Sequence, residues 1–197
     1  MGKRFYHFMC GVIRPYYSLV YPVRIEGLEN LPPEGACIVC ANHLHARDPI
    51  YLAVRIRRRM LHFMAKAELF KWKPLAAILK GLEAFPVDRG HNDLNAVRTA
   101  LKLLSDGHVL GVFPQGTRSR TNERLPMLSG ISLIALRAGK PVIPVFIGGP
   151  YRLFRRTPVR IGAPVDLSDL GRKVDGQTLE AATRRIEDAV WALRDAP

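Results

Sequence analysis

The chain contains few cysteines and none of them is arranged as a framework. Only three of its 197 residues are cysteine, Cys10, Cys37 and Cys40, and this odd number argues against disulfides and for a reducing compartment. Cys37 and Cys40 fall inside the apolar run 36–41, where strand residues three apart point to opposite faces. We therefore expect core packing and no metal site. The sequence also lacks a Gly-x-Ser-x-Gly turn, which argues against a serine nucleophile of the hydrolase type.

Acidic residues are scarce as well. The chain has 17 Asp and Glu against 30 Lys and Arg, and its formal net charge is +13. This excess predicts an anionic partner: nucleic acid, a membrane surface or a phosphorylated substrate. The basic clusters lack an aromatic stacking platform, and no zinc or helix-turn-helix signature is present, so we expect no nucleic acid. A length of 197 residues with 48% hydrophobic content predicts one well-packed domain.

The N-terminal segment has no acidic residue before Glu26 and no apolar run long enough to cross a membrane. Residues 5–23 hold Phe, Tyr, Met and Ile, but Arg14 and Pro15 interrupt them, which disfavours a membrane-spanning helix. The absence of a small-residue cleavage site argues against a secretory signal. We expect residues 1–30 to be an amphipathic membrane-associating segment, a hairpin or a pair of short helices on an anionic membrane surface. The alternative is a helix that packs on the domain.

Beyond residue 30, apolar runs alternate with amphipathic stretches. Strands are expected at 36–41, 61–65, 84–87, 109–113, 142–147 and 158–161, and helices at 49–59, 74–80, 92–106, 128–138 and 177–194. This alternation predicts an α/β fold in which a mostly parallel sheet is flanked by helices on both faces. Ligands of such folds bind at the carboxyl ends of the strands, so polar residues that follow a strand are candidates for a site.

One candidate follows the first predicted strand. The stretch Asn42-His43-Leu44-His45-Ala46-Arg47-Asp48-Pro49 puts an imidazole and a carboxylate five positions apart, with Asp48 suited to the N-cap of the next helix and Pro49 to its first position. A carboxylate there can turn back to one ring nitrogen of His43 and leave the other nitrogen as a base for a hydroxyl. From these residues alone, a helix cap without a catalytic role is an equal alternative.

Basic side chains follow three further strands: Lys66 the second, Arg89 the third and Arg118 the fourth. Gly116 and Thr117 precede Arg118, and a glycine there lets backbone amides approach a phosphate closely. Each cation alone could be a solvated surface charge. Together, around one imidazole and one carboxylate, they predict a site for an anionic substrate.

The stretch from Asn42 to Asp48 resembles the N-H-x4-D signature of the glycerolipid acyltransferases, the family of the bacterial 1-acylglycerol-3-phosphate acyltransferases. Three blocks similar to those of that family follow in its order, at 85–89, 113–119 and 142–145. The resemblance implies transfer of a fatty acyl group from a thioester, either acyl-CoA or acyl carrier protein, to the free hydroxyl of 1-acylglycerol-3-phosphate, which gives phosphatidic acid. It implies neither a cofactor nor a metal, and a location at the cytoplasmic face of the cell membrane, peripheral or monotopic.

By the same resemblance, His43 would be the general base and Asp48 would fix its tautomer, with direct attack and no acyl-enzyme, in an acyltransferase domain of residues 31–197. The acceptor phosphate would be bound by Lys66, Arg89, Gly116, Thr117 and Arg118. Two departures concern the acceptor: Gln115 stands where the family usually has Glu, and the basic residue common before the glycine at position 130 is missing. Another lysolipid, such as a lyso-aminolipid, is therefore the alternative acceptor.

Two arginine clusters lie outside these blocks. Either could contact an anionic bilayer or an acidic acyl carrier protein, and a solvated face is an equal alternative for each. The clusters are Arg55, Arg57, Arg58 and Arg59, and Arg152, Arg155, Arg156 and Arg160.

Overall fold

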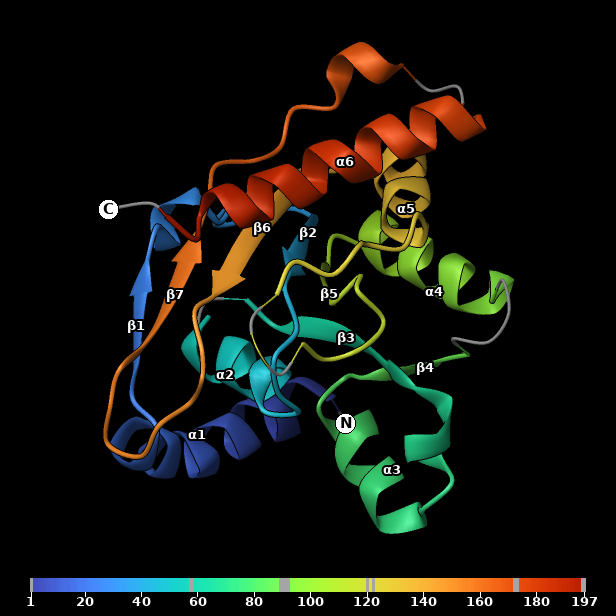
Figure 1. The fold of residues 1–197 in the computed structure, drawn as a ribbon. Helices are drawn as coiled ribbons and strands as arrows, with labels where there is room; N and C mark the ends of the chain where they lie inside the picture. The colour runs from blue at the N-terminus through green and yellow to red at the C-terminus, as the bar shows by residue number, and fades with distance from the viewer. Residues whose placement is uncertain are drawn as a thin grey trace.

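The computed structural model describes residues 2–56, 59–88, 93–119, 121, 123–171 and 174–195, and these form a seven-stranded sheet in the order β1-β7-β6-β2-β5-β3-β4 (Figure 1). The neighbours from β6 to β4 pair in parallel, β6 pairs antiparallel with β7, and β1 pairs in parallel with β7. The strands are β1 (Val23–Glu26), β2 (Cys37–Ala41), β3 (Leu61–Lys66), β4 (Phe85–Val87), β5 (Val109–Val112), β6 (Val142–Ile147) and β7 (Thr157–Ile161).

Helices cover both faces of this sheet. On one side lie α1 (Gly2–Val20), α2 (Asp48–Arg55) and α3 (Lys73–Gly81), and on the other lie α4 (Leu94–Ser105), α5 (Gly130–Ala138) and α6 (Gly176–Ala192) (Figure 1). Short 3-10 turns occur at Leu28–Asn30, Ala67–Phe70 and Ser168–Leu170. The predicted α/β fold with a mostly parallel sheet is confirmed.

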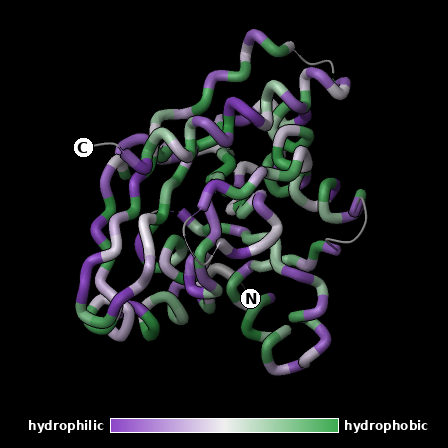
Figure 2. Tube along the Cα trace, in the orientation of Figure 1, coloured by the Kyte–Doolittle hydropathy of each residue, from purple (hydrophilic) through white to green (hydrophobic). Residues whose placement is uncertain are grey.

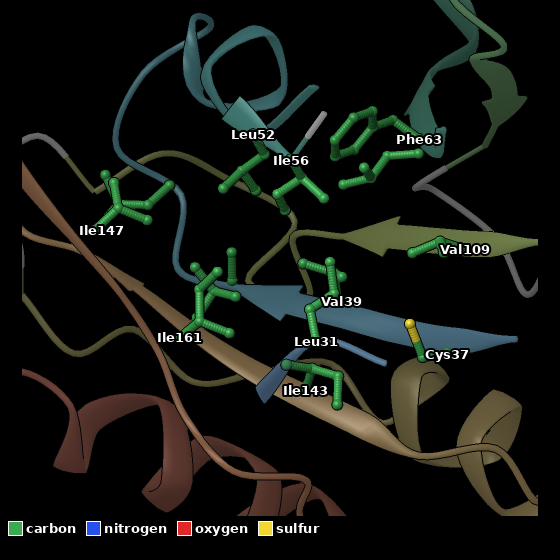
Figure 3. Close-up of a cluster of buried hydrophobic side chains, with 14 residues drawn as sticks. Leu31, Cys37, Val39, Leu52, Ile56, Phe63, Val109, Ile143, Ile147 and Ile161 are labelled. Atoms are coloured by element: carbon green, nitrogen blue, oxygen red, sulfur yellow. The ribbon is translucent and has the colours of Figure 1, made fainter. Parts of the chain in front are cut away.

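The central strand β2 is buried on both faces and supplies both layers of the core. Cys37 and Val39 face the layer that includes Leu52 of α2, which Figure 3 shows in close-up. Ile38 and Cys40 face the other layer, where they pack against residues of α4, α5 and α6. The two cysteines therefore point to opposite sides of the sheet, as their spacing predicts, and each is a core residue.

Helix α2 begins one residue earlier than predicted. Asp48 is its first residue, and Arg47 occupies the cap position without a side-chain hydrogen bond to the helix. The carboxylate of Asp48 is unavailable to cap its own helix because it turns back and accepts hydrogen bonds from the backbone N–H groups of Leu44 and His45. The predicted N-cap at Asp48 is therefore wrong, although Pro49 does lie in the first turn.

The N-terminal segment forms one 19-residue helix, α1, and not the expected hairpin or pair of helices. Pro15 lies inside it, and the helix continues because one of its faces packs on the domain. There, the buried Tyr6 accepts a hydrogen bond from the N–H of Leu61 at 3.3 Å, and Tyr17 meets the ring of Tyr51 edge-on at 4.9 Å. The alternative of packing on the domain is thus realised on this face.

Another face of α1 is apolar and exposed. Five large side chains at helical spacing are between 38% and 71% exposed: Phe5, Phe8, Val12, Tyr16 and Leu19, hereafter the α1 stripe. Figure 2 shows how hydrophobic and hydrophilic residues alternate along this helix at one end of the molecule. No helix among the described residues has both the length and the apolar content needed to cross a membrane.

Candidate active site

The imidazole and the carboxylate predicted as a pair lie directly after the carboxyl end of β2 and are in contact. Nδ1 of His43 is 2.7 Å from Oδ2 of Asp48, and the exposed fractions of the two residues are 7% and 0%. Because the carboxylate oxygen is the acceptor, Nδ1 of His43 carries the proton and donates a hydrogen bond to Asp48. Nε2 of His43 has no hydrogen-bond partner within the described residues, so it is the nitrogen left to act as a base.

The carboxylate of Asp48 accepts hydrogen bonds from within the protein on both of its oxygens. Oδ2 also accepts from the N–H of Leu44 at 2.6 Å and the N–H of His45 at 2.8 Å, and Oδ1 accepts from the hydroxyl of Tyr151 at 2.7 Å. These four donors hold the buried carboxylate in one orientation. The ring of His43 is thereby held in one tautomer.

Tyr151 was not among the residues predicted for the site. It follows β6, in the segment Gly148–Tyr151 that leaves the carboxyl end of that strand. Burial raises the pKa of Tyr151 far above its usual value and the nearby Asp48 raises it further, so its hydroxyl stays protonated and remains a donor. The rule that polar residues after a strand are candidates, applied to the strand predicted at 142–147, would have identified it.

The backbone of His43 is fixed from both sides by residues distant in sequence. The side chain of Asn42 donates to the carbonyl of Ile147 at 2.9 Å and accepts from its N–H at 2.7 Å, which fastens the end of β2 to β6. The N–H of His43 donates to Oε1 of Gln115 at 2.7 Å, and its carbonyl accepts from the N–H of Ser119 at 2.8 Å. The imidazole therefore projects from an immobilised main chain.

The side chain of Gln115 forms hydrogen bonds within this loop region and does not line the cavity described below. It is 5% exposed; its Oε1 accepts from His43, and its Nε2 lies 3.5 Å from the carbonyl of Leu125. A glutamate in this place would present the same kind of acceptor to the same N–H. The departure from the family pattern at position 115 therefore concerns the position of His43.

A cavity of about 1110 Å³ opens at the carboxyl ends of the strands beside this pair. Its lining combines loops that follow β2, β3, β5 and β6: Leu44, His45, Arg47, Lys66, Gly116, Thr117, Arg118, Thr121, Gly149, Pro150 and Tyr151. The structure thus brings Lys66, Gly116, Thr117 and Arg118 to one cavity. Arg89 lies outside the described residues.

The cations of this cavity are available to an anionic ligand. Lys66 pairs with Glu68 at 3.1 Å, but both side chains are about half exposed, and a surface pair of this kind is worth at most about 1 kcal/mol. Arg118 is also exposed. Gly116 has φ of +67°, the left-handed conformation that glycine adopts without strain, so the loop can turn at this point.

The arginine clusters are partly structural. Arg59 donates to the carbonyls of Pro32, at 2.8 Å, and Gly35, and Arg160 contacts Glu26 at 3.2 Å and the carbonyl of Leu193 at 3.1 Å. These two guanidinium groups therefore hold segments of the fold together. Arg152, Arg155 and Arg156 are exposed, while Arg57 and Arg58 lie outside the described residues.

Comparison with known proteins identifies the family. The family model described as Acyltransferase matches residues 22–148, from the segment before β1 to the end of β6. The chain is also 32% identical over 195 residues to the 1-acyl-sn-glycerol-3-phosphate acyltransferase of Bacillus subtilis (strain 168), with 96% of this chain and 97% of that protein covered. The chain belongs to the acyltransferase family. The recognition from the N-H-x4-D signature is confirmed.

Two further proteins are similar to this acyltransferase. The 1-acyl-sn-glycerol-3-phosphate acyltransferase of Streptococcus pneumoniae (strain ATCC BAA-255 / R6) is 27% identical over 194 residues, which cover 94% of this chain and 71% of that protein. The crystal structure of PlsC, the 1-acyl-sn-glycerophosphate acyltransferase from Thermotoga maritima, matches with a TM-score of 0.68 and 25% identity, over 98% of this chain and 80% of that one. The acyltransferase therefore has a PlsC-like fold.

The cysteines of this acyltransferase are unsuited to act as nucleophiles. Burial raises the pKa of Cys37 to about 11, and burial also raises the pKa of Cys40 strongly. Both thiols are in β2, within the two core layers. A thiol in such surroundings stays protonated and inert, so neither can accept an acyl group at neutral pH.

Proposed function

We propose that this acyltransferase moves a fatty acyl group from a thioester to the free hydroxyl of 1-acylglycerol-3-phosphate and so produces phosphatidic acid. The observation that carries the proposal is the buried His43–Asp48 pair beside a cavity with Lys66 and Arg118 in its lining. The printed names of the relatives in Bacillus subtilis and Streptococcus pneumoniae support the same reaction. The interior position of Gln115, where it holds the N–H of His43, supports this acceptor over a different lysolipid.

In this proposal His43 is the general base. Nε2 takes the proton of the acceptor hydroxyl while Nδ1 donates to Asp48, and the oxygen attacks the thioester carbonyl. When the tetrahedral intermediate collapses, the carbon–sulfur bond breaks and the imidazolium returns the proton to the departing thiolate. Asp48 stabilises the imidazolium between these two transfers. A positioned base contributes about a hundred- to ten-thousand-fold to the rate, and no acyl-enzyme is required.

The acceptor phosphate binds, in this proposal, among the cations at the strand ends. Lys66 and Arg118 donate charge-assisted hydrogen bonds, each worth about 1.5–3 kcal/mol, and Gly116 and Thr117 shape the loop that approaches the phosphate. Arg89 completes the set by its place in the family pattern. These contacts give a phosphomonoester an advantage over a neutral head group.

The test compares His43→Ala with the matched variant His108→Ala, which removes an imidazole near the start of β5. We expect His43→Ala to abolish transfer of a labelled acyl group to 1-acylglycerol-3-phosphate and to leave vesicle binding intact, while His108→Ala retains transfer. Turnover retained by His43→Ala would refute the mechanism. Each assay is run with acyl-CoA and with acyl carrier protein, because either thioester can be the donor and no added cofactor is expected.

We also propose that α1, within a membrane-associating segment of residues 1–30, docks on the cytoplasmic face of the cell membrane. The α1 stripe is exposed, and Leu153 and Phe154 extend it, since the N–H of Phe154 donates to the carbonyl of Val20 at 2.8 Å. Three exposed arginines flank these two residues and can face anionic head groups.

Vesicle sedimentation tests this docking. Replacing Phe8 or Leu19 with Glu should reduce binding to vesicles that contain anionic phospholipid, because a charge enters the apolar face. Leu94→Glu is the matched control, since Leu94 is 59% exposed on α4, across the sheet from α1. If the Phe8→Glu and Leu19→Glu variants bound vesicles as well as the Leu94→Glu control does, docking by α1 would be excluded.

A further inference from the structure

Within the described part of the chain, the hydroxyl of Tyr151 is the one donor to Asp48 that comes from outside the segment of residues 43–48. Among the described residues, Oδ2 of Asp48 is held by His43, Leu44 and His45, all within five positions, whereas Oδ1 accepts only from Tyr151, at 2.7 Å. Rotation of the carboxylate about its χ2 angle would exchange the two oxygens and disturb the bond to His43. A donor on Oδ1 opposes this rotation.

The ring of Tyr151 is itself held in place. It stacks on the ring of Tyr51 with 4.5 Å between centroids and 10° between planes, and Tyr17 of α1 packs edge-on against the other ring at 4.9 Å. This three-ring column fixes where the hydroxyl of Tyr151 can lie. The hydroxyl of Tyr51 is buried and has no hydrogen-bond partner within the described residues, so Tyr51 supports Tyr151 through its ring.

We propose that Tyr151 is a positioning residue for acyl transfer: its hydroxyl holds the Asp48 carboxylate in the orientation that aims Nε2 of His43 at the acceptor hydroxyl. The inference rests on the function proposed above. It concerns a residue that contacts the catalytic pair at Asp48 and acts through that carboxylate.

Loss of this donor has an electrostatic consequence as well. When Oδ1 loses its hydrogen bond, more of the negative charge acts on the imidazolium, which is then stabilised relative to the neutral ring. The acidic limb of the pH profile of kcat/KM therefore moves to higher pH. The other charged and titratable groups that the described residues place around the pair and its cavity are Tyr17, His45, Arg47, Tyr51, Lys66 and Arg118, and they are the same with and without the hydroxyl.

The experiment compares Tyr151→Phe with Tyr51→Phe in the full-length enzyme on vesicles that contain 1-acylglycerol-3-phosphate. Both variants keep the three rings and remove one hydroxyl, but only the first hydroxyl reaches Asp48. We expect Tyr151→Phe to lower kcat about ten-fold, the effect of losing about 1.4 kcal/mol, with KM little changed and the acidic limb moved to higher pH. Tyr51→Phe should stay within about two-fold of the parent with an unmoved limb.

Two outcomes would overturn the inference. A rate and pH profile unchanged in Tyr151→Phe would show that the hydroxyl only completes the packing, and a rise in KM alone would make Tyr151 a contact of the substrate. Thermal unfolding of both variants verifies that each is folded at the assay temperature. Turnover by the parent enzyme reports separately on the proposed function, so failure of that function and failure of this inference are distinguishable.

Discussion

Substituting Gln115 by Leu distinguishes a residue that positions His43 from one that contacts the acceptor. In the variant the buried N–H of His43 loses its acceptor at 2.7 Å, and an unsatisfied buried donor costs about 1–3 kcal/mol. For a chain of this size, each 1 kcal/mol lowers the unfolding temperature by about 2–4 °C, so a fall of about 2–12 °C is expected. If the His43 loop relaxes by as much as 1 Å, kcat falls about a hundred-fold.

Gln115→Glu and Gln177→Leu are the matched variants. The first keeps an oxygen that can accept from His43 and should retain more activity than Gln115→Leu, and the second makes the same replacement at an exposed position on α6 and should change nothing. Differential scanning calorimetry gives the unfolding temperature, and kcat/KM is compared between 1-acylglycerol-3-phosphate and a neutral monoacylglycerol. If either variant at position 115 changed this ratio without lowering the unfolding temperature, Gln115 would be an acceptor contact and our reasoning would be refuted.

Lys66→Ala and Arg118→Ala should each raise KM for 1-acylglycerol-3-phosphate by about ten-fold or more with a smaller effect on kcat, measured by steady-state kinetics; an equal loss with a neutral acceptor would argue against phosphate binding. Asn42→Ala removes two buried hydrogen bonds to β6 and should lower the free energy of unfolding by about 2–4 kcal/mol in urea titrations. Burial, with His108 nearby, lowers the pKa of His62 to about 4 from 6.5. As the pH falls, the unfolded chain therefore binds the proton first, and the free energy of unfolding decreases between pH 6.5 and pH 4. In His62→Phe, urea titrations should find this decrease smaller by about 2–3 kcal/mol.

Strands that are apolar throughout were predictable from sequence, because a parallel strand covered on both faces has no polar position to interrupt the pattern. The runs at 36–41 and 142–147 match β2 and β6 within one residue. β1 was not predicted, because its short sequence Val-Arg-Ile-Glu carries two charged residues that pair with each other at 2.7 Å and gives no long apolar run. Its place beside β7 is decided by pairing across more than 130 residues.

The candidate site likewise combines a contact that was predictable from sequence with contacts that were not. The contact between His43 and Asp48 spans five residues, and a local pattern of strand, turn and helix start suffices to suggest it. The contacts that hold this pair and the neighbouring Asn42 span between 72 and 105 residues and join them to Gln115, Ile147 and Tyr151. No local signal gives the partner of a polar side chain at such a separation, although the topology places all three loops at one edge of the sheet.

In the proposed mechanism, these long-range contacts hold the short motif in place so that His43 can act as a base without a nucleophile beside it. A loop between a strand and a helix is ordinarily mobile, and a mobile imidazole would have to be oriented anew in each turnover. Here Asn42 ties the loop to β6, Gln115 holds the N–H of His43, and the Tyr151 hydroxyl holds the carboxylate. In the proposed mechanism none of these three groups touches the acceptor phosphate, whereas Lys66 and Arg118 of the cavity do. The proposed mechanism therefore separates two kinds of substitution: those that loosen the loop lower kcat, and those that remove a cation raise KM.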